Sequence, residues 1–154
     1  ATLFPYTTLF RSAIIMAHEP AAADAIADTS AWCDLKYAHG VYMIIEHYRG
    51  GDTDFVLSVH TGTTATGTTA VAVNFPIWVA TSALTDPTLV RQSDSTGYTI
   101  DTGVYTGSQI VVFYIPAALV YRYVQLGASG GNASSIASVL YQYDRLRYAG
   151  DQAV

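Results

Sequence analysis

Short stretches of alternating apolar and polar residues run along much of this chain. In residues 54–61 (DFVLSVHT), every second position is apolar (Phe55, Leu57 and Val59), with polar residues at most positions between them. Residues 69–75 and 133–143 alternate in the same way. Because successive side chains of a strand point to opposite faces, this period of two predicts half-buried β-strands.

Two further segments are expected to be strands. Residues 41–48 (VYMIIEHY) are rich in β-branched and aromatic residues, and residues 109–115 (QIVVFYI) are apolar on both faces, so we place the second segment at the centre of a sheet. Shorter strand candidates are residues 88–92, 98–101 and 121–126. No helical pattern separates these segments, and turn signals recur between them. We therefore expect an all-β chain, an antiparallel β-sandwich of about eight strands, jelly-roll-like or immunoglobulin-like.

Turn residues and composition divide the chain into regions. The run Arg49-Gly50-Gly51-Asp52 has the composition of a hairpin turn, and residues 62–69 and 127–132 form loops. The Ala-rich stretch before Trp32 has no clean apolar stripe. We expect a flexible, extended arm over residues 13–30, with a short helix as the alternative, a sandwich over residues 31–148 and a tail over residues 149–154.

The balance of charge excludes several kinds of partner. Apolar residues make up 51% of the chain and charged residues 12%, with a net charge of −5 and a single lysine, Lys36. A nucleic-acid-binding surface needs clustered Lys and Arg, which this sequence does not have. The apolar runs are too short to span a bilayer. We expect neither a nucleic acid nor a membrane as partner, and we expect the lone Cys33 to be a buried free thiol.

No motif for catalysis, cofactor binding or metal binding stands out. His47 and His60 could meet across the expected hairpin, but a zinc site needs more ligands, so we favour solvated surface histidines. The acids Asp52, Asp54 and Asp94 lie in or beside turns, where turn chemistry accounts for them. The sequence therefore predicts a protein that is not an enzyme, with no catalytic, cofactor or metal site.

Residues 2–12 (TLFPYTTLFRS) resemble the translation of a common short-read sequencing adapter. Each codon of one frame of that adapter gives the residue found here. We interpret residues 1–12 as an artefact of an untrimmed, environmental DNA assembly and exclude them from fold reasoning. Met16 is then a candidate start, although a lost N-terminus is equally compatible.

From Trp32 onward the order of features resembles small head-associated structural proteins of tailed bacteriophages. The resemblance covers residues 30–152 and rests on pattern and order. It begins with Trp32 and the run Asp34-Leu35-Lys36-Tyr37, and it ends with the run RYAGDQ at residues 147–152. Between them lie a Thr/Gly-rich loop, the stretch YTIDT at residues 98–102 and the apolar strand at residues 109–115.

This resemblance implies a virion protein, assembled in the cytoplasm of a bacterial host, that decorates or stabilises a capsid. Its expected partners are the major capsid protein or other virion subunits, with homo-oligomers as a further expectation. We expect residues 17–31 and 145–154 to contact neighbouring subunits. The alternatives are a neck or tail component, and a carbohydrate-binding sandwich in which Trp32 and Trp78 form a sugar-stacking platform.

Overall fold

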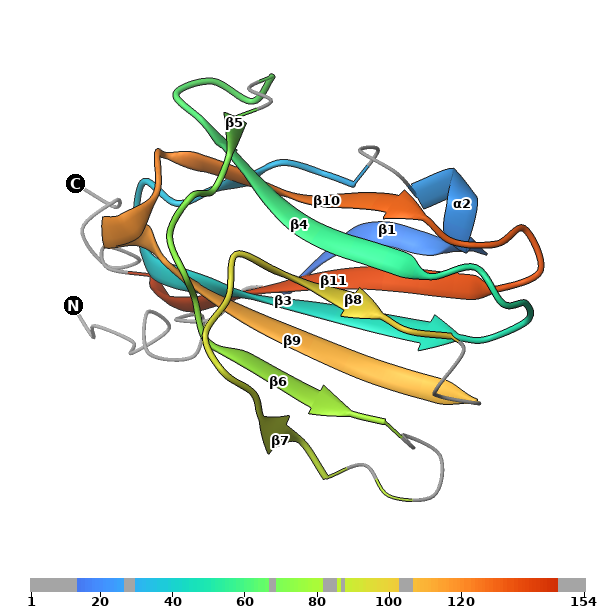
Figure 1. The fold of residues 1–154 in the computed structure, drawn as a ribbon. Coiled ribbons are helices and arrows are strands. Elements are labelled where there is room, and N and C mark those ends of the chain that lie inside the picture. The colour runs from blue at the N-terminus through green and yellow to red at the C-terminus, as the bar shows by residue number, and fades with distance from the viewer. Residues whose placement is uncertain are drawn as a thin grey trace, which may run out of the picture.

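The computed structural model of the chain describes residues 14–26, 30–66, 69–81, 86, 88–102 and 107–146. Within these ranges two antiparallel β-sheets pack face to face (Figure 1). The prediction of an all-β antiparallel sandwich is therefore confirmed. Residues 1–12, taken as adapter-derived, and the tail over residues 149–154 lie outside the described residues.

The larger sheet has six strands in the order β1-β11-β3-β9-β6-β7. Their bounds are β1 Ile14–Ala22, β11 Ile136–Leu146, β3 Ala38–Tyr48, β9 Ser108–Pro116, β6 Ile77–Ala80 and β7 Val90–Arg91. The expected central position of residues 109–115 is correct, because β9 lies between β3 and β6.

The smaller sheet has five strands and follows the order β2-β10-β4-β5, with β8 also paired to β4. Their bounds are β2 Cys33–Asp34, β10 Tyr123–Gly130, β4 Phe55–Gly62, β5 Thr69–Ala70 and β8 Gly97–Ile100. Two short helical turns complete the described chain, α2 at Ala23–Ile26 and a 3-10 turn η1 at Ala117–Leu119. β10 continues to Gly130, so the loop expected over residues 127–132 begins later than predicted.

The hydrophobic core fills the space between the two sheets. Its largest fully buried side chains are contributed by both layers: Phe55 and Leu57 from β4, Met43 and Ile45 from β3, Phe113 and Ile115 from β9, and Tyr141 from β11. Each such apolar side chain contributes roughly 1.5–3 kcal/mol when it is removed from water. The alternation predicted for β4 is confirmed, because Phe55, Leu57 and Val59 all face this core.

The connection after β3 passes from one sheet to the other. β3 pairs with β11 and β9, whereas β4 pairs with β10, β5 and β8, so the hairpin expected at residues 49–52 is wrong. The glycines there serve a different purpose. A side chain at Gly50 would lie 1.8 Å from the carbonyl oxygen of Ser134, so the chain crosses between layers at a point with no room for a Cβ.

The expected flexible arm over residues 13–30 is also wrong for the residues described. β1 pairs with β11 from Ile14 to Ala22, and Ala17, Ala23 and Ile26 are buried in the core. The sandwich therefore already includes residues 14–26. The Ala-rich sequence has little apolar bulk but fits a close-packed edge, which composition alone does not reveal. Contact of residues 17–26 with a neighbouring subunit would have to occur as part of a folded sheet.

Candidate functional site

The two histidines considered as a metal pair lie in different sheets. His47 is on β3 and points into the sandwich, where it is 2% exposed, so the prediction of a surface histidine is wrong for this residue. His60 is on β4, at the position that alternates with the buried Leu57 and Val59. The two side chains therefore do not lie on a common face of one sheet. Among the described residues, no group of three or more His, Cys, Asp and Glu side chains could hold a metal ion.

His47 occupies an apolar environment. Its ring stacks on Phe55, with centroids 5.5 Å apart and an angle of 23° between the planes. Within the described chain neither ring nitrogen has a hydrogen-bond partner, nor does Oε1 of Gln109, which pairs with His47 across the sheet. Burial holds the pKa of His47 below its usual value, because water no longer solvates the charged form.

The carboxylates near turns behave as the sequence indicates. Asp52 forms an ion pair with Arg49, and Asp94 forms one with Arg91. Oδ1 of Asp54 accepts a hydrogen bond from the backbone N–H of Thr102 at 3.1 Å. These contacts hold turns and connections in place.

Cys33 is buried, as predicted. Burial raises the pKa of its thiol to about 11, and the negative charge of Asp34 adds to this. A thiol with such a pKa is almost fully protonated at neutral pH and is a poor nucleophile.

The outward-facing side of the larger sheet carries a run of apolar side chains. One row of directly paired residues crosses all six strands. It consists of Met16 (β1), Leu140 (β11), Ile44 (β3), Val112 (β9), Trp78 (β6) and Arg91 (β7), and is called the outer row below. Five consecutive members are apolar, whereas the outer face of an antiparallel sheet is commonly polar.

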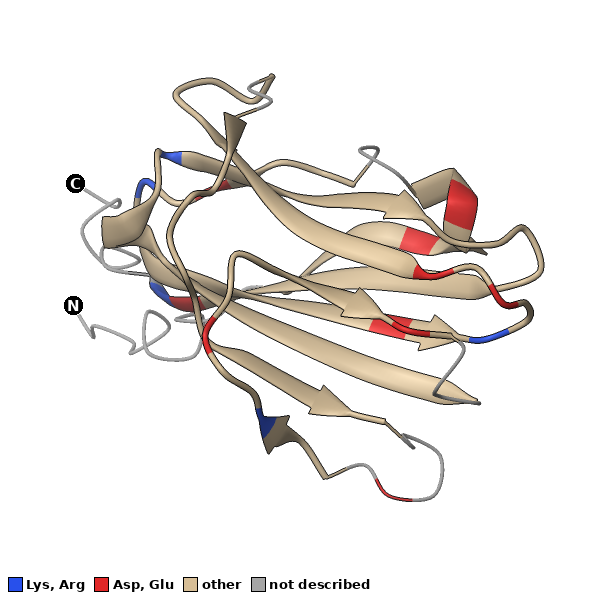
Figure 2. Cartoon of the chain, viewed as in Figure 1, with Lys and Arg blue, Asp and Glu red and all other residues tan. Residues whose placement is uncertain are grey.

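A second row beside the outer row adds one aliphatic and two aromatic side chains to this surface. Beside the outer row run Ile14, Gln142, Tyr42 and Tyr114, which are also paired in register. The rings of Tyr42 and Tyr114 lie 4.7 Å apart. The Tyr114 hydroxyl donates a hydrogen bond to Asp144 at 2.7 Å, and burial together with this bond raises the pKa of Tyr114 to about 12. Figure 2 shows that β6 and β9, the adjacent strands that carry Trp78 and Val112, have no charged residue.

A groove of about 470 Å³ lies over the outer row. Tyr42, Ile44, Trp78, Leu89, Val112 and Gln142 line it. The guanidinium of Arg91 lies 5.0 Å from the centre of the Trp78 ring and covers one end of the row. Trp78 is only partly buried, whereas Val112 beneath the groove is 8% exposed.

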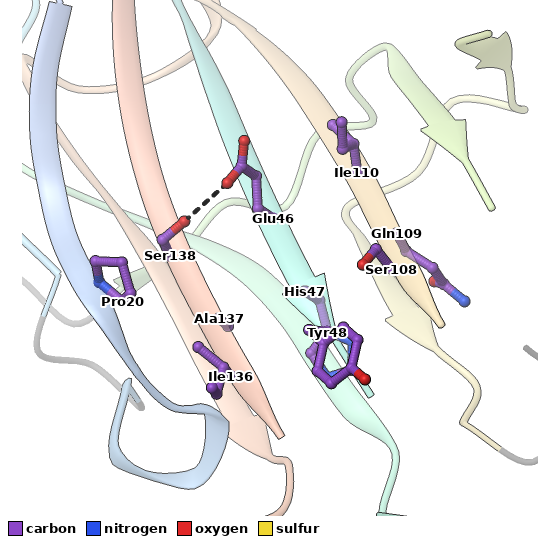
Figure 3. Close-up of a pocket in the computed structure, with 10 residues that line it drawn as sticks. All are labelled: Pro20, Glu46, His47, Tyr48, Ser108, Gln109, Ile110, Ile136, Ala137 and Ser138. Carbon is purple, nitrogen blue, oxygen red and sulfur yellow. Dashed lines mark hydrogen bonds between the residues drawn. The ribbon is translucent and has the colours of Figure 1, made fainter. Parts of the chain in front are cut away.

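Further along the same face is a second hollow, about 370 Å³ in volume, which we call the cup. Its outward-pointing side chains are Pro20 from β1, Ile136 and Ser138 from β11, Glu46 and Tyr48 from β3, and Ser108 and Ile110 from β9 (Figure 3). The Ser138 hydroxyl donates a hydrogen bond to Glu46 Oε2 at 3.3 Å, across the β3–β11 pair.

The two tryptophans do not form the shared platform that the carbohydrate-binding alternative requires. Both are partly buried. Trp78 lies on the outer face of the larger sheet, whereas Trp32 directly precedes β2 of the smaller sheet. Trp78 instead shares its groove with Tyr42.

Sequence reasoning missed the outer row, although a signal for it was present. Residues 41–48 and 109–115 are apolar at both parities, and we attributed this in the second segment to a central position in the sheet. A central strand of a sandwich still has one face outside. Apolar residues at both parities therefore indicate either a covering layer or a surface that binds something.

Comparison with known proteins gives little further information. No family model matches the chain, and no curated protein matches it. One similar solved structure contains the CBM22-1 and GH10 modules of endo-1,4-beta-D-xylanase 10B from Clostridium thermocellum, complexed with xylohexaose. It is 7% identical over 87% of this chain and 26% of that chain, with a TM-score of 0.28. The chain thus spans about a quarter of that protein's length, and so weak a likeness carries no argument.

No helix among the described residues is long and apolar enough to cross a membrane.

Proposed function

We propose that this chain is a non-enzymatic structural protein of a tailed bacteriophage that decorates or stabilises the capsid. It would bind the major capsid protein, or another virion subunit, through the outer face of the larger sheet. The observation that carries the proposal is the outer row, in which five apolar side chains from Met16 to Trp78 lie side by side across five strands.

The composition of this face favours a protein partner. Interfaces between proteins are depleted of charge at their centre and enriched in Tyr, Trp, Met and Arg. Here Trp78, Tyr42 and Met16 surround an aliphatic centre, and Arg91 lies at one edge. Met16 and Ile14 remain 56% and 69% exposed. Covering them would remove apolar surface from water, which is the main driving force of association.

The phage assignment adds the identity of the partner and rests on the order of features from Trp32 onward. It can be tested first on the DNA that encodes the chain. We expect a major capsid gene among the neighbouring genes. Flanking DNA without any phage structural gene would contradict the assignment.

The docking surface can then be tested with matched variants. The chain would be co-expressed with that capsid protein, and its amount on purified particles would be measured. We expect Ile44→Glu and Met16→Glu to weaken binding at least about tenfold, because each buries a charge in an apolar contact.

The control is Val56→Glu, on the outer face of the smaller sheet, where Val56 is 40% exposed. It introduces the same charge on a comparably exposed apolar residue and should leave particle binding unchanged. Equal loss in all three variants would point to general destabilisation, which thermal unfolding would reveal. Full binding by Ile44→Glu would contradict the proposed surface.

A second candidate function, carbohydrate binding, is favoured by one observation. Trp78 and Tyr42 share the groove with the amide side chain of Gln142, and sugars bind by stacking on aromatic rings and bonding to nearby polar groups. In this case the migration of the chain through a native gel should slow when a soluble polysaccharide is cast into it, and Trp78→Ala should abolish the effect. Unchanged migration across a panel of plant and bacterial polysaccharides would exclude this alternative.

A further inference from the structure

The cup contains one carboxylate, Glu46, that pairs with no cationic side chain of the described residues. Glu46 is exposed in the lining of the cup, and its interaction with Ser138 is a hydrogen bond rather than an ion pair. Within the described ranges Glu46 forms no salt bridge. No cationic side chain of the described residues therefore balances its negative charge.

The described arginines are already engaged elsewhere. Each forms an ion pair with another acid: Arg49 with Asp52, Arg91 with Asp94, Arg122 with Asp34, and Arg145 with Asp144. Lys36 lies over the ring of Tyr37, 4.7 Å from its centre. A cation for Glu46 would thus have to come from outside the described chain.

The remaining walls of the cup suit a long basic side chain. Ile110, Ile136 and Pro20 offer apolar surface, which the methylene stem of a lysine or arginine can cover. The hydroxyls of Ser108, Ser138 and Tyr48 can accept hydrogen bonds from an ammonium or guanidinium group. An anionic group would be repelled by Glu46.

We infer that the cup receives a lysine or arginine side chain of the protein that covers the outer face. The occupant is thus part of a protein partner with a basic residue beside an apolar patch. This inference rests on the proposed docking function and names the chemistry of the partner. Complementary charge adds specificity to an apolar contact, because a partner with an acid at this position would be excluded.

The cup can be tested without the partner by using small probes. The isotope-labelled chain would be titrated with N-acetyl-arginine amide and, separately, with N-acetyl-citrulline amide. Citrulline has nearly the same shape as arginine but no charge. Two-dimensional NMR would follow the backbone amides of Glu46, Ile110 and Ser138, which come from three adjacent strands.

We expect the arginine probe to shift these three amides and to bind at least about fivefold more tightly than the citrulline probe, since the bond to Glu46 is charge-assisted. The Glu46→Gln variant keeps an acceptor for Ser138 and should lose the difference between the probes. Asp86→Asn makes the same change of charge at an exposed acid that does not line the cup, and this variant should keep the difference between the probes.

Three results would overturn the inference: equal response to both probes, an unchanged response in Glu46→Gln, or no shift at tens of millimolar arginine probe. A methyl glycoside that shifts the same amides when the arginine probe does not would assign the cup to carbohydrate instead. The outcome is separable from the docking proposal. Loss of particle binding in Ile44→Glu with no probe binding would overturn the cup alone. The reverse pattern would overturn the docking surface, and with it the source proposed for the basic side chain, but not the preference of the cup for a guanidinium group.

Discussion

Replacing Tyr141 with phenylalanine tests how the two sheets are joined. Tyr141 belongs to β11 of the larger sheet and is fully buried, yet its hydroxyl accepts a hydrogen bond from the backbone N–H of Leu126, at 2.8 Å, in β10 of the smaller sheet. β10 pairs with β2 only at Tyr123 and Val124. Beyond Val124, β2 offers no backbone hydrogen-bond partner to β10. At Leu126 the acceptor is instead the hydroxyl of Tyr141, which comes from the other sheet.

The expected cost follows from this geometry. The substitution removes one oxygen and leaves the ring in place, so the loss of apolar contact is small. The N–H of Leu126, a residue with no exposed surface, loses its acceptor. A buried donor left without a partner costs about 1–3 kcal/mol. In a domain of this size that lowers the midpoint of thermal unfolding by about 4 °C for each kcal/mol.

Urea unfolding of wild type and Tyr141→Phe, followed by circular dichroism, would measure this cost. The control is Tyr121→Phe, at a tyrosine that is 56% exposed, and its free energy of unfolding should stay within about 0.5 kcal/mol of wild type. If Tyr141→Phe lowered the free energy of unfolding by less than about 0.5 kcal/mol, the hydrogen bond from the Leu126 N–H to the Tyr141 hydroxyl would add nothing to stability, contrary to what we expect.

Three further predictions concern buried and strained positions. Because the pKa of His47 is lowered in the folded chain, the unfolded chain binds a proton more readily, and the free energy of unfolding should fall as the pH drops below 6.5, the ordinary pKa of histidine. Urea titrations on either side of that pH should show this fall, and His47→Phe should reduce the dependence of stability on pH. Cys33, whose pKa is raised to about 11, should react with iodoacetamide in the native state only as fast as the chain opens, and rapid native labelling would contradict its burial. Gly130 has a φ of +71°, and a Cβ there would lie 2.4 Å from the carbonyl oxygen of Asp54, so Gly130→Ala should lower the free energy of unfolding by at least about 1 kcal/mol. Gly107 has a φ of +104°, but a Cβ there would have no atom within 4 Å, so Gly107→Ala should cost less. Equal losses in the two variants would argue against the close approach at Gly130.

The sequence was sufficient to predict strands but not the assignment of strands to sheets. Alternation identified β4 and β11, and residues apolar at both parities identified β9 as central. Such patterns arise from local contacts of each strand with the core. The path of the chain between the two sheets depends on segments distant in sequence, such as the close approach of Gly50 to Ser134. The composition of the turn alone was therefore misleading.

The position of His47 could have been derived from parity alone. Val41, Met43 and Ile45 share its face of β3, and all are buried. Because every second side chain of a strand points to the same face, His47 had to point into the core unless the strand ended before it. Its polarity suggested the surface, but the apolar residues that share its face determined the outcome.

The first strand shows the opposite limitation. Ala17 and Ala23 are buried, but alanine carries too little apolar surface to mark a core position in a pattern. Only the pairing of β1 with β11, and the burial of Ala17 and of Ala23 just after the strand, show that this segment belongs to the sandwich. The outer row was hidden for a related reason, since Met16, Leu140 and Ile44 become neighbours only because β11 pairs with both β1 and β3.

Oxidative footprinting can show whether a protein partner covers the outer face. Hydroxyl radicals oxidise exposed methionine, tryptophan and tyrosine side chains, and mass spectrometry would compare the isolated chain with the chain bound to purified particles. We expect Met16 and Trp78 to become protected on particles, while Tyr121, which lies outside the outer row, is oxidised as before. Equal oxidation of Met16 and Trp78 in both states would contradict this expectation.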